Sequence, residues 1–171
     1  RFSWTDSSMV DGLFTRPSVV ALSDLADDEE RSFVVLLLAL AAWARARNRT
    51  VTRPVEHLLV LEEAHRILPE VDERAADSEA GSAKQVSAGM LSAMMAEVRS
   101  YGEQIIVIDQ SPSRVSADVS RNTNLKIAHR LVHPEDQAQV AGVLGLPDGA
   151  APLLGHLERG HAICATRTEP G

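Results

Sequence analysis

The sequence contains a single cysteine, Cys164, few aromatic residues (4%), and fewer basic than acidic side chains. One cysteine cannot form an internal disulfide, which fits a reducing, cytoplasmic location. The longest apolar run, residues 33–43, is shorter than the about 20 residues that cross a bilayer, and no signal peptide is visible. The net charge of −7 excludes a broad DNA-binding face, so any contact with nucleic acid would be local.

The length and the apolar content bound the architecture. A chain of 171 residues with 44% hydrophobic side chains suits one domain with a sizeable core and excludes disorder throughout. The first residue is Arg1 rather than Met, and residues 1–11 show no clear periodicity. We therefore expect residues 1–171 to be a single, partial domain, excised from a longer protein.

Short apolar runs alternate with helical patterns through most of the chain. We expect strands at residues 18–22, 58–61, 104–109, 125–128 and 161–166. We expect helices at residues 27–47, 84–101, 115–120 and 134–142. This alternation predicts an α/β fold with a mainly parallel sheet and helices on both faces.

Two segments depart from the regular pattern. The first helix should begin with a capping box, Asp27 and Glu30, but its middle, residues 33–43, is apolar on every side. It should be buried all round, or one face should meet another subunit. Residues 70–89 are rich in Asp, Glu, Ala, Ser and Gly and predict a mobile loop. That loop is either functional or a tolerated surface insertion.

Polar side chains follow two of the expected strands. Glu62 and Glu63 come after residues 58–61, at the carboxyl edge where open α/β sheets bind ligands. Glu62 would hold Mg²⁺ directly or through water, and Glu63 would orient or deprotonate a water. The alternative is a core strand followed by a solvated Glu-Glu turn.

The sequence gives little support for other kinds of catalytic or metal site. No Cys/His cluster has zinc spacing, and no Gly-x-Ser-x-Gly elbow accompanies the serines near residues 111–113. His65 and His129 are typical of packed or hydrogen-bonded histidines rather than ligands. We therefore expect neither a zinc site nor a serine hydrolase.

Four segments in this order resemble the RecA-like motor core of the HerA/FtsK superfamily, and the HerA branch in particular. Residues 60–65 (Val-Leu-Glu-Glu-Ala-His) resemble its Walker B element. Residues 105–113 resemble its sensor strand, which usually ends in Thr-Gln-Ser-Pro. The other two are residues 122–131, similar to the following strand, and 157–162, similar to the closing element. The resemblance spans about residues 18–166.

The resemblance implies a ring-forming, ATP-driven DNA translocase or helicase. Its P-loop, Gly-x-x-x-x-Gly-Lys-Ser/Thr, does not occur in these 171 residues; in the family it lies upstream. The chain would then be the C-terminal part of a P-loop NTPase core, with ATP and Mg²⁺ as cofactors. Hydrolysis would need the full-length chain, and the piece alone should be inactive. The implied partners are further copies in a hexamer, double-stranded DNA in the central pore, and a nuclease or other effector.

Site roles follow from the matched motifs. Glu62 matches the Walker B position that supports Mg²⁺, where Asp is more usual, and Glu63 matches the catalytic carboxylate that positions water. Gln110 matches the sensor that contacts the γ-phosphate. The resemblance therefore implies that Glu62, Glu63 and Gln110 converge on one phosphate-binding edge. Asp109 stands where the family usually has Thr, which adds a negative charge near the phosphates.

Two arginines are candidates for a finger that reaches a neighbouring subunit's nucleotide. Arg99 lies 11 residues before Gln110, where related conjugation ATPases place such a residue. The alternative for Arg99 is an ion pair with a surface acid such as Glu103. Arg130 is the second candidate, and its alternative role is to close a strand. A non-catalytic RecA-like scaffold or regulatory module is the alternative function.

Overall fold

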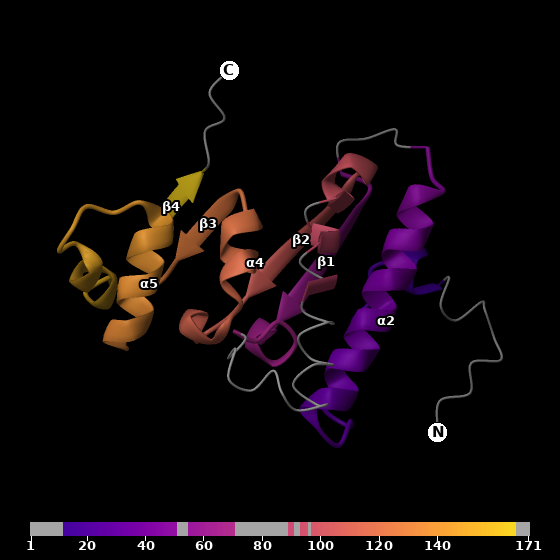
Figure 1. The fold of residues 1–171 in the computed structure, drawn as a ribbon, viewed down its shortest axis with the longest axis horizontal. Helices are drawn as coiled ribbons and strands as arrows, with labels where there is room; N and C mark the ends of the chain where they lie inside the picture. The colour runs from indigo at the N-terminus through magenta and orange to yellow at the C-terminus, as the bar shows by residue number, and fades with distance from the viewer. Residues whose placement is uncertain (1–11, 51–54, 71–88, 91–92, 96, 167–171) are drawn as a thin grey trace.

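The computed structural model describes residues 12–50, 55–70, 89–90, 93–95 and 97–166, apart from the side chains of Val98 and Arg99. Its first half contains α2 (Asp28–Arg47), β1 (His57–Glu62), η1 (Ala64–Arg66), η3 (Val98–Tyr101) and β2 (Glu103–Ile108). Its second half contains η4 (Pro112–Arg114), α4 (Ala117–Asn122), β3 (Leu125–Ala128), α5 (Pro134–Leu144), η5 (Ala151–Gly155) and β4 (Ile163–Thr166). Figure 1 shows α2 beside the β1–β2 pair, and β3, β4 and α5 together at the other end.

α2 begins where the sequence predicts, but its burial differs from the prediction. The Asp27 carboxylate accepts the Glu30 N–H at 2.8 Å, while the Glu30 carboxylate accepts the Ala26 N–H at 3.1 Å. The helix buries a single stripe, and Phe33 on another side is 60% exposed. The stripe consists of Ser32, Val35, Ala39, Ala42 and Ala46. Burial all round is therefore wrong, because the described elements pack on one face only. The alternative, that one face of this helix meets another subunit, stays a prediction.

β1 and β2 form a parallel pair, in register from His57 opposite Glu103 to Glu62 opposite Ile108. One face packs on α2 through Leu59, Leu61, Ile105 and Val107. The other face carries Leu58, Val60, Ile106 and Ile108, each 45–46% exposed. The apolar runs predicted strands buried on both faces; only one face is covered by the part of the chain described.

The second half is built around an antiparallel pair, with Leu125 of β3 opposite Thr166 of β4. α5 begins with Pro134 after the N-cap His133 and ends at Gly145, which has a φ of 69°. Its apolar side packs with β3 and η5 in a small core of Ala128, Ala141, Leu144 and Leu154. None of the described helices is long and apolar enough to cross a membrane.

The α/β class is confirmed, but the sheet differs from the prediction. The described residues form two two-stranded sheets, one parallel and one antiparallel, rather than one mainly parallel sheet with helices on both faces. The strand expected at residues 18–22 is wrong: this segment has no regular structure, and Val19 is 95% exposed. A run of apolar residues indicates that a segment can be buried. Whether it forms a strand depends on pairing with another strand that is distant in the sequence.

The loop predicted at residues 70–89 lies mostly outside the described residues. Its first residue, Glu70, donates its N–H to the Arg114 carbonyl at 2.8 Å and accepts the Ala117 N–H at 2.7 Å. Its last residue, Gly89, is helical. Both ends of the predicted loop therefore belong to ordered structure.

Candidate functional site

The carboxyl ends of β1 and β2 bring two predicted site residues together. Because the strands are parallel and Glu62 is opposite Ile108, the residues that follow each strand leave the same edge of the sheet. The Gln110 Nε2 donates to Glu63 Oε1 at 2.8 Å, although the two residues are 47 positions apart. The expected convergence of Glu63 and Gln110 is therefore present.

Glu63 has an unusual backbone conformation. With φ 53° and ψ 47°, it is left-handed, and it is the one non-glycine residue with positive φ in the described part. The turn continues into η1, where the Arg66 N–H donates to the Glu63 carbonyl at 3.0 Å. Such conformations cost about 1–3 kcal/mol and persist only where the surroundings enforce them. The side chain is 41% exposed, so the carboxylate remains accessible.

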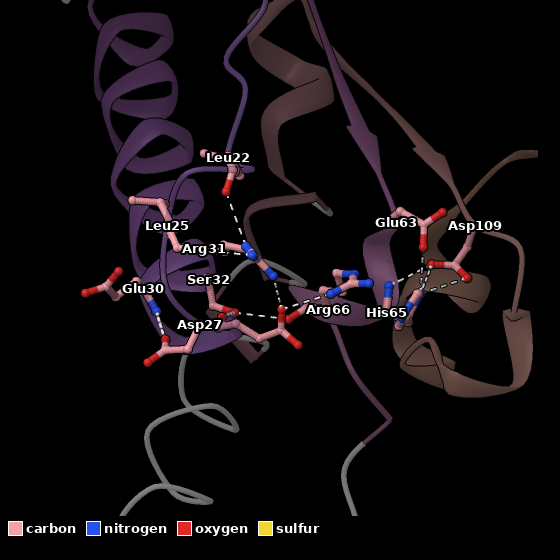
Figure 2. A network of polar contacts seen from close by, with 11 residues as sticks. Leu22, Leu25, Asp27, Glu30, Arg31, Ser32, Glu63, His65, Arg66 and Asp109 are labelled. Atoms are coloured by element: carbon pink, nitrogen blue, oxygen red, sulfur yellow. Dashed lines mark hydrogen bonds and ion pairs between the residues drawn. The ribbon is translucent and has the colours of Figure 1, made fainter.

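Asp109 lies close to Glu63, and its carboxylate is turned toward His65 (Figure 2). Its side chain is only 6% exposed. Its Oδ2 accepts the His65 backbone N–H at 2.7 Å, and its Oδ1 accepts the Ser111 N–H at 2.7 Å. The negative charge that replaces the usual Thr is thus satisfied by the protein rather than exposed at the edge.

The His65 ring completes these contacts. Its Nδ1 lies 2.9 Å from Asp109 Oδ2 and 3.8 Å from Glu63 Oε2, and the side chain is 8% exposed. Because an ionised carboxylate only accepts hydrogen bonds, Nδ1 carries the proton in this contact. The prediction of a hydrogen-bonded histidine is confirmed. The sequence motifs did not predict the contact between His65 and Asp109. The one indication in the sequence was that Asp109 stands where the resembled family usually has Thr.

Glu62 ends β1 on the exposed face that Leu58 and Val60 share. No group of three or more metal-binding side chains occurs among the residues described. Mg²⁺ commonly uses only one or two carboxylates and completes its shell with waters and phosphates. Glu62 alone could therefore supply one such carboxylate from this face of the strand.

The two arginine candidates lie in different places. Arg99 belongs to η3, which directly precedes β2, and its side chain is outside the description. A six-residue strand separates that end from the Gln110 end by about 20 Å, beyond the reach of an arginine side chain. Glu103, its suggested alternative partner, is bound by Arg49 and His57, each at 2.7 Å. Arg130 is exposed just after β3.

The loop after Gln110 is fastened to the second half of the molecule. The Ser113 N–H in η4 donates at 3.0 Å to Asp136, an acid of α5 that is only 4% exposed. A cavity of about 340 Å³ lies between these elements. Its lining residues are Ser111, Ser113, Arg114, His133, Pro134, Glu135 and Asp136. This pocket is open to the surface, and Ser111, the residue after Gln110, is one of its lining residues.

A polar network fastens η1 to the start of α2 (Figure 2). The Arg66 guanidinium donates to Asp28 at 3.1 Å, and the Ser32 hydroxyl lies 3.0 Å from the Arg66 carbonyl oxygen. Arg31 also donates to Asp28, at 2.8 Å. The hydrogen bond from Arg31, and then that from Arg66, holds the pKa of Asp28 below its ordinary value.

No protein-family model matches the chain. Over 92 residues it is 32% identical to a protein of Methanocaldococcus jannaschii described as a probable DNA double-strand break repair helicase HerA. The match covers 54% of this chain and 16% of that protein, so the chain corresponds to a small part of the relative it matches. The chain therefore has a distant, partial similarity to a HerA helicase.

Proposed function

We propose that the chain is the C-terminal portion of a HerA-type, ring-forming ATPase that translocates or unwinds DNA. The observation that carries the proposal is the Glu63–Gln110 contact of 2.8 Å at the carboxyl edge of two parallel strands. The partial similarity to a HerA helicase supports the same conclusion. ATP hydrolysis would require the full-length protein, which would supply the P-loop.

Glu63 acts as the general base in this proposal. One of its oxygens accepts the Gln110 amide, which leaves the other oxygen to accept a hydrogen from the attacking water. The carbonyl oxygen of Gln110 can orient the same water, and the second hydrogen of its amide nitrogen can be donated to the γ-phosphate. Glu62 would hold Mg²⁺, which when bound neutralises negative charge on the phosphates.

Arg99 acts in trans. Its position at the opposite end of β2 from Gln110 leaves it too far to serve its own site, which favours a neighbouring subunit's nucleotide. Such an arrangement needs a heterologous interface that closes into a ring, for which we propose a hexamer. Arg130 remains the second candidate for this role.

DNA is the proposed substrate of the movement, held in the central pore. With a net charge of −7, the chain would contact DNA through a few basic side chains and backbone groups on pore loops. A nuclease or other effector is the proposed further partner. The non-catalytic scaffold is the competing function, in which the fold is kept without hydrolysis.

The test is ATP turnover by the full-length protein with Glu63→Gln. We expect turnover to fall roughly 10²–10⁴-fold, because the amide cannot accept the water's proton. Glu158→Gln, at an exposed turn, is the matched control and should behave as wild type. Unchanged turnover in the Glu63 variant would refute the assignment of the base. A wild-type protein that binds no ATP would support the scaffold.

A further inference from the structure

We propose that Asp109 and His65 form a positioning pair that holds Glu63 and Gln110 in their reactive geometry. The proposal rests on the proposed function and adds two residues to its site. Neither residue needs to touch the nucleotide. Their task would be to join the two loops that carry the base and the sensor.

The Asp109 carboxylate bonds to both loops at once. One oxygen accepts the backbone N–H of His65, two residues after Glu63, at 2.7 Å. The other oxygen accepts the backbone N–H of Ser111, the residue after Gln110, at 2.7 Å. The two contacts therefore bracket the base and the sensor, and they set the separation of the loops from which both side chains project.

The His65 ring adds a side-chain contact to these backbone hydrogen bonds. Its Nδ1 donates to the Asp109 carboxylate at 2.9 Å and lies 3.8 Å from the nearer Glu63 oxygen. Both side chains are less than 9% exposed, and hydrogen bonds are stronger there than in water. The ring thus lies next to the carboxylate of Glu63, a residue whose left-handed backbone costs energy unless its surroundings enforce it.

A carboxylate suits position 109 in this arrangement better than an amide. The Ser111 and His65 N–H groups point to different oxygens, so an Asn would direct its own NH₂ at one of them. Because the His65 ring also lies against this carboxylate, loss of either side chain should disturb the same pair of loops.

The test compares variants of the full-length protein by kcat and KM for ATP. We expect Asp109→Asn and His65→Ala to lower kcat roughly 10–100-fold, as displaced catalytic groups do, with KM within about twofold of wild type. His65→Asn should recover most of kcat, because its amide can donate to Asp109 in place of Nδ1. His156→Ala, an exposed histidine bound to the Pro152 carbonyl, is the matched control.

A second comparison, in which His65 is substituted in both the wild-type and the Glu63→Gln protein, distinguishes a positioning role from a general loss of stability. In the Glu63→Gln background, His65→Ala should cost less than about twofold in the residual rate, because the group it positions is already gone. A purely structural role would lower both backgrounds equally and would also lower the melting temperature. If His65→Ala does not fold, Asp109→Asn carries the same comparison.

The outcomes distinguish the two proposals. If Glu63→Gln loses turnover while His65→Ala and Asp109→Asn keep kcat within about twofold, only the positioning pair is refuted. Equal losses in both backgrounds, or failure of His65→Asn to recover activity, also refute it. If Glu63→Gln retains wild-type turnover, the proposed function itself is wrong.

Discussion

At the scale of single residues, the site depends on how a few side chains are held. Glu63 adopts a conformation that costs energy, and Asp109 keeps a buried charge by accepting hydrogen bonds from both loops. Glu63 was identifiable from its place after an apolar run, as was Gln110. The inward orientation of Asp109 was not, since nothing local distinguishes a buried carboxylate from an exposed one.

The left-handed backbone of Glu63 can be tested by comparing Glu63→Gly with Glu63→Ala. Both remove the carboxylate, so they differ mainly in backbone freedom. We expect the glycine variant to have the higher free energy of unfolding, by about 1 kcal/mol, because glycine adopts positive φ without strain. Urea denaturation measures this difference. At an ordinary helical site glycine is the less stable of the two, so that order here would contradict the assigned conformation.

Asp28 provides a pH-dependent test. Its pKa is lowered in the folded protein, first by the Arg31 hydrogen bond and then by Arg66, so its ionised form is favoured by folding. Its contribution is present above the ordinary aspartate pKa and is lost as pH falls through the lowered folded value. We expect the stability difference between wild type and Asp28→Asn to shrink over that acidic range. Denaturation curves at several pH values check this, and a constant difference would contradict it.

At the scale of elements, local patterns located most strands and helices. The strand expected at residues 125–128 coincides with β3, and those at 58–61 and 104–109 agree with β1 and β2 to within a residue. The exception, residues 18–22, has a similar apolar run but no described strand partner. Composition therefore predicts that a segment can be a strand, while pairing decides whether it becomes one.

The start of α2 is a test at this scale. The Asp27 side chain accepts the Glu30 N–H, one of the helix's unpaired donors. We expect Asp27→Ala to lower the free energy of unfolding by about 1 kcal/mol, and Asp27→Asn to lower it much less, because Asn also caps helices. Thermal or urea melts measure both. Equal losses for the two variants would show that the cap does not contribute.

At the scale of the whole molecule, the described residues cover only one face of the β1–β2 sheet. Leu58, Val60, Ile106 and Ile108 leave the other face partly open, each 45–46% exposed. Apolar surface of this kind, next to unpaired strand edges, promotes association between chains. Single-sequence patterning could not reveal it, because the strands read as buried on both sides.

We expect the 171-residue chain, prepared alone, to self-associate through this face. Val60→Lys combined with Ile106→Lys should shift it toward monomer, whereas Val132→Lys, at a position that is 74% exposed elsewhere, should not. Sedimentation velocity measures the distribution, and circular dichroism verifies that each variant is folded. A wild-type chain that stays monomeric at high concentration would contradict the expectation.

The sequence by itself determined the local features: the apolar runs, the cap of α2, the acids that follow β1 and the amide that follows β2. These depend on neighbouring residues and on the repeat of each element. Only the tertiary structure decided the antiparallel pairing of β3 with β4, the open sheet face and the contact of Asp109 with His65. The reason is physical, because the partners in such contacts are far apart in the sequence: 44 positions separate His65 from Asp109, and α5 and η5 lie between β3 and β4. No local pattern specifies which distant partner completes them.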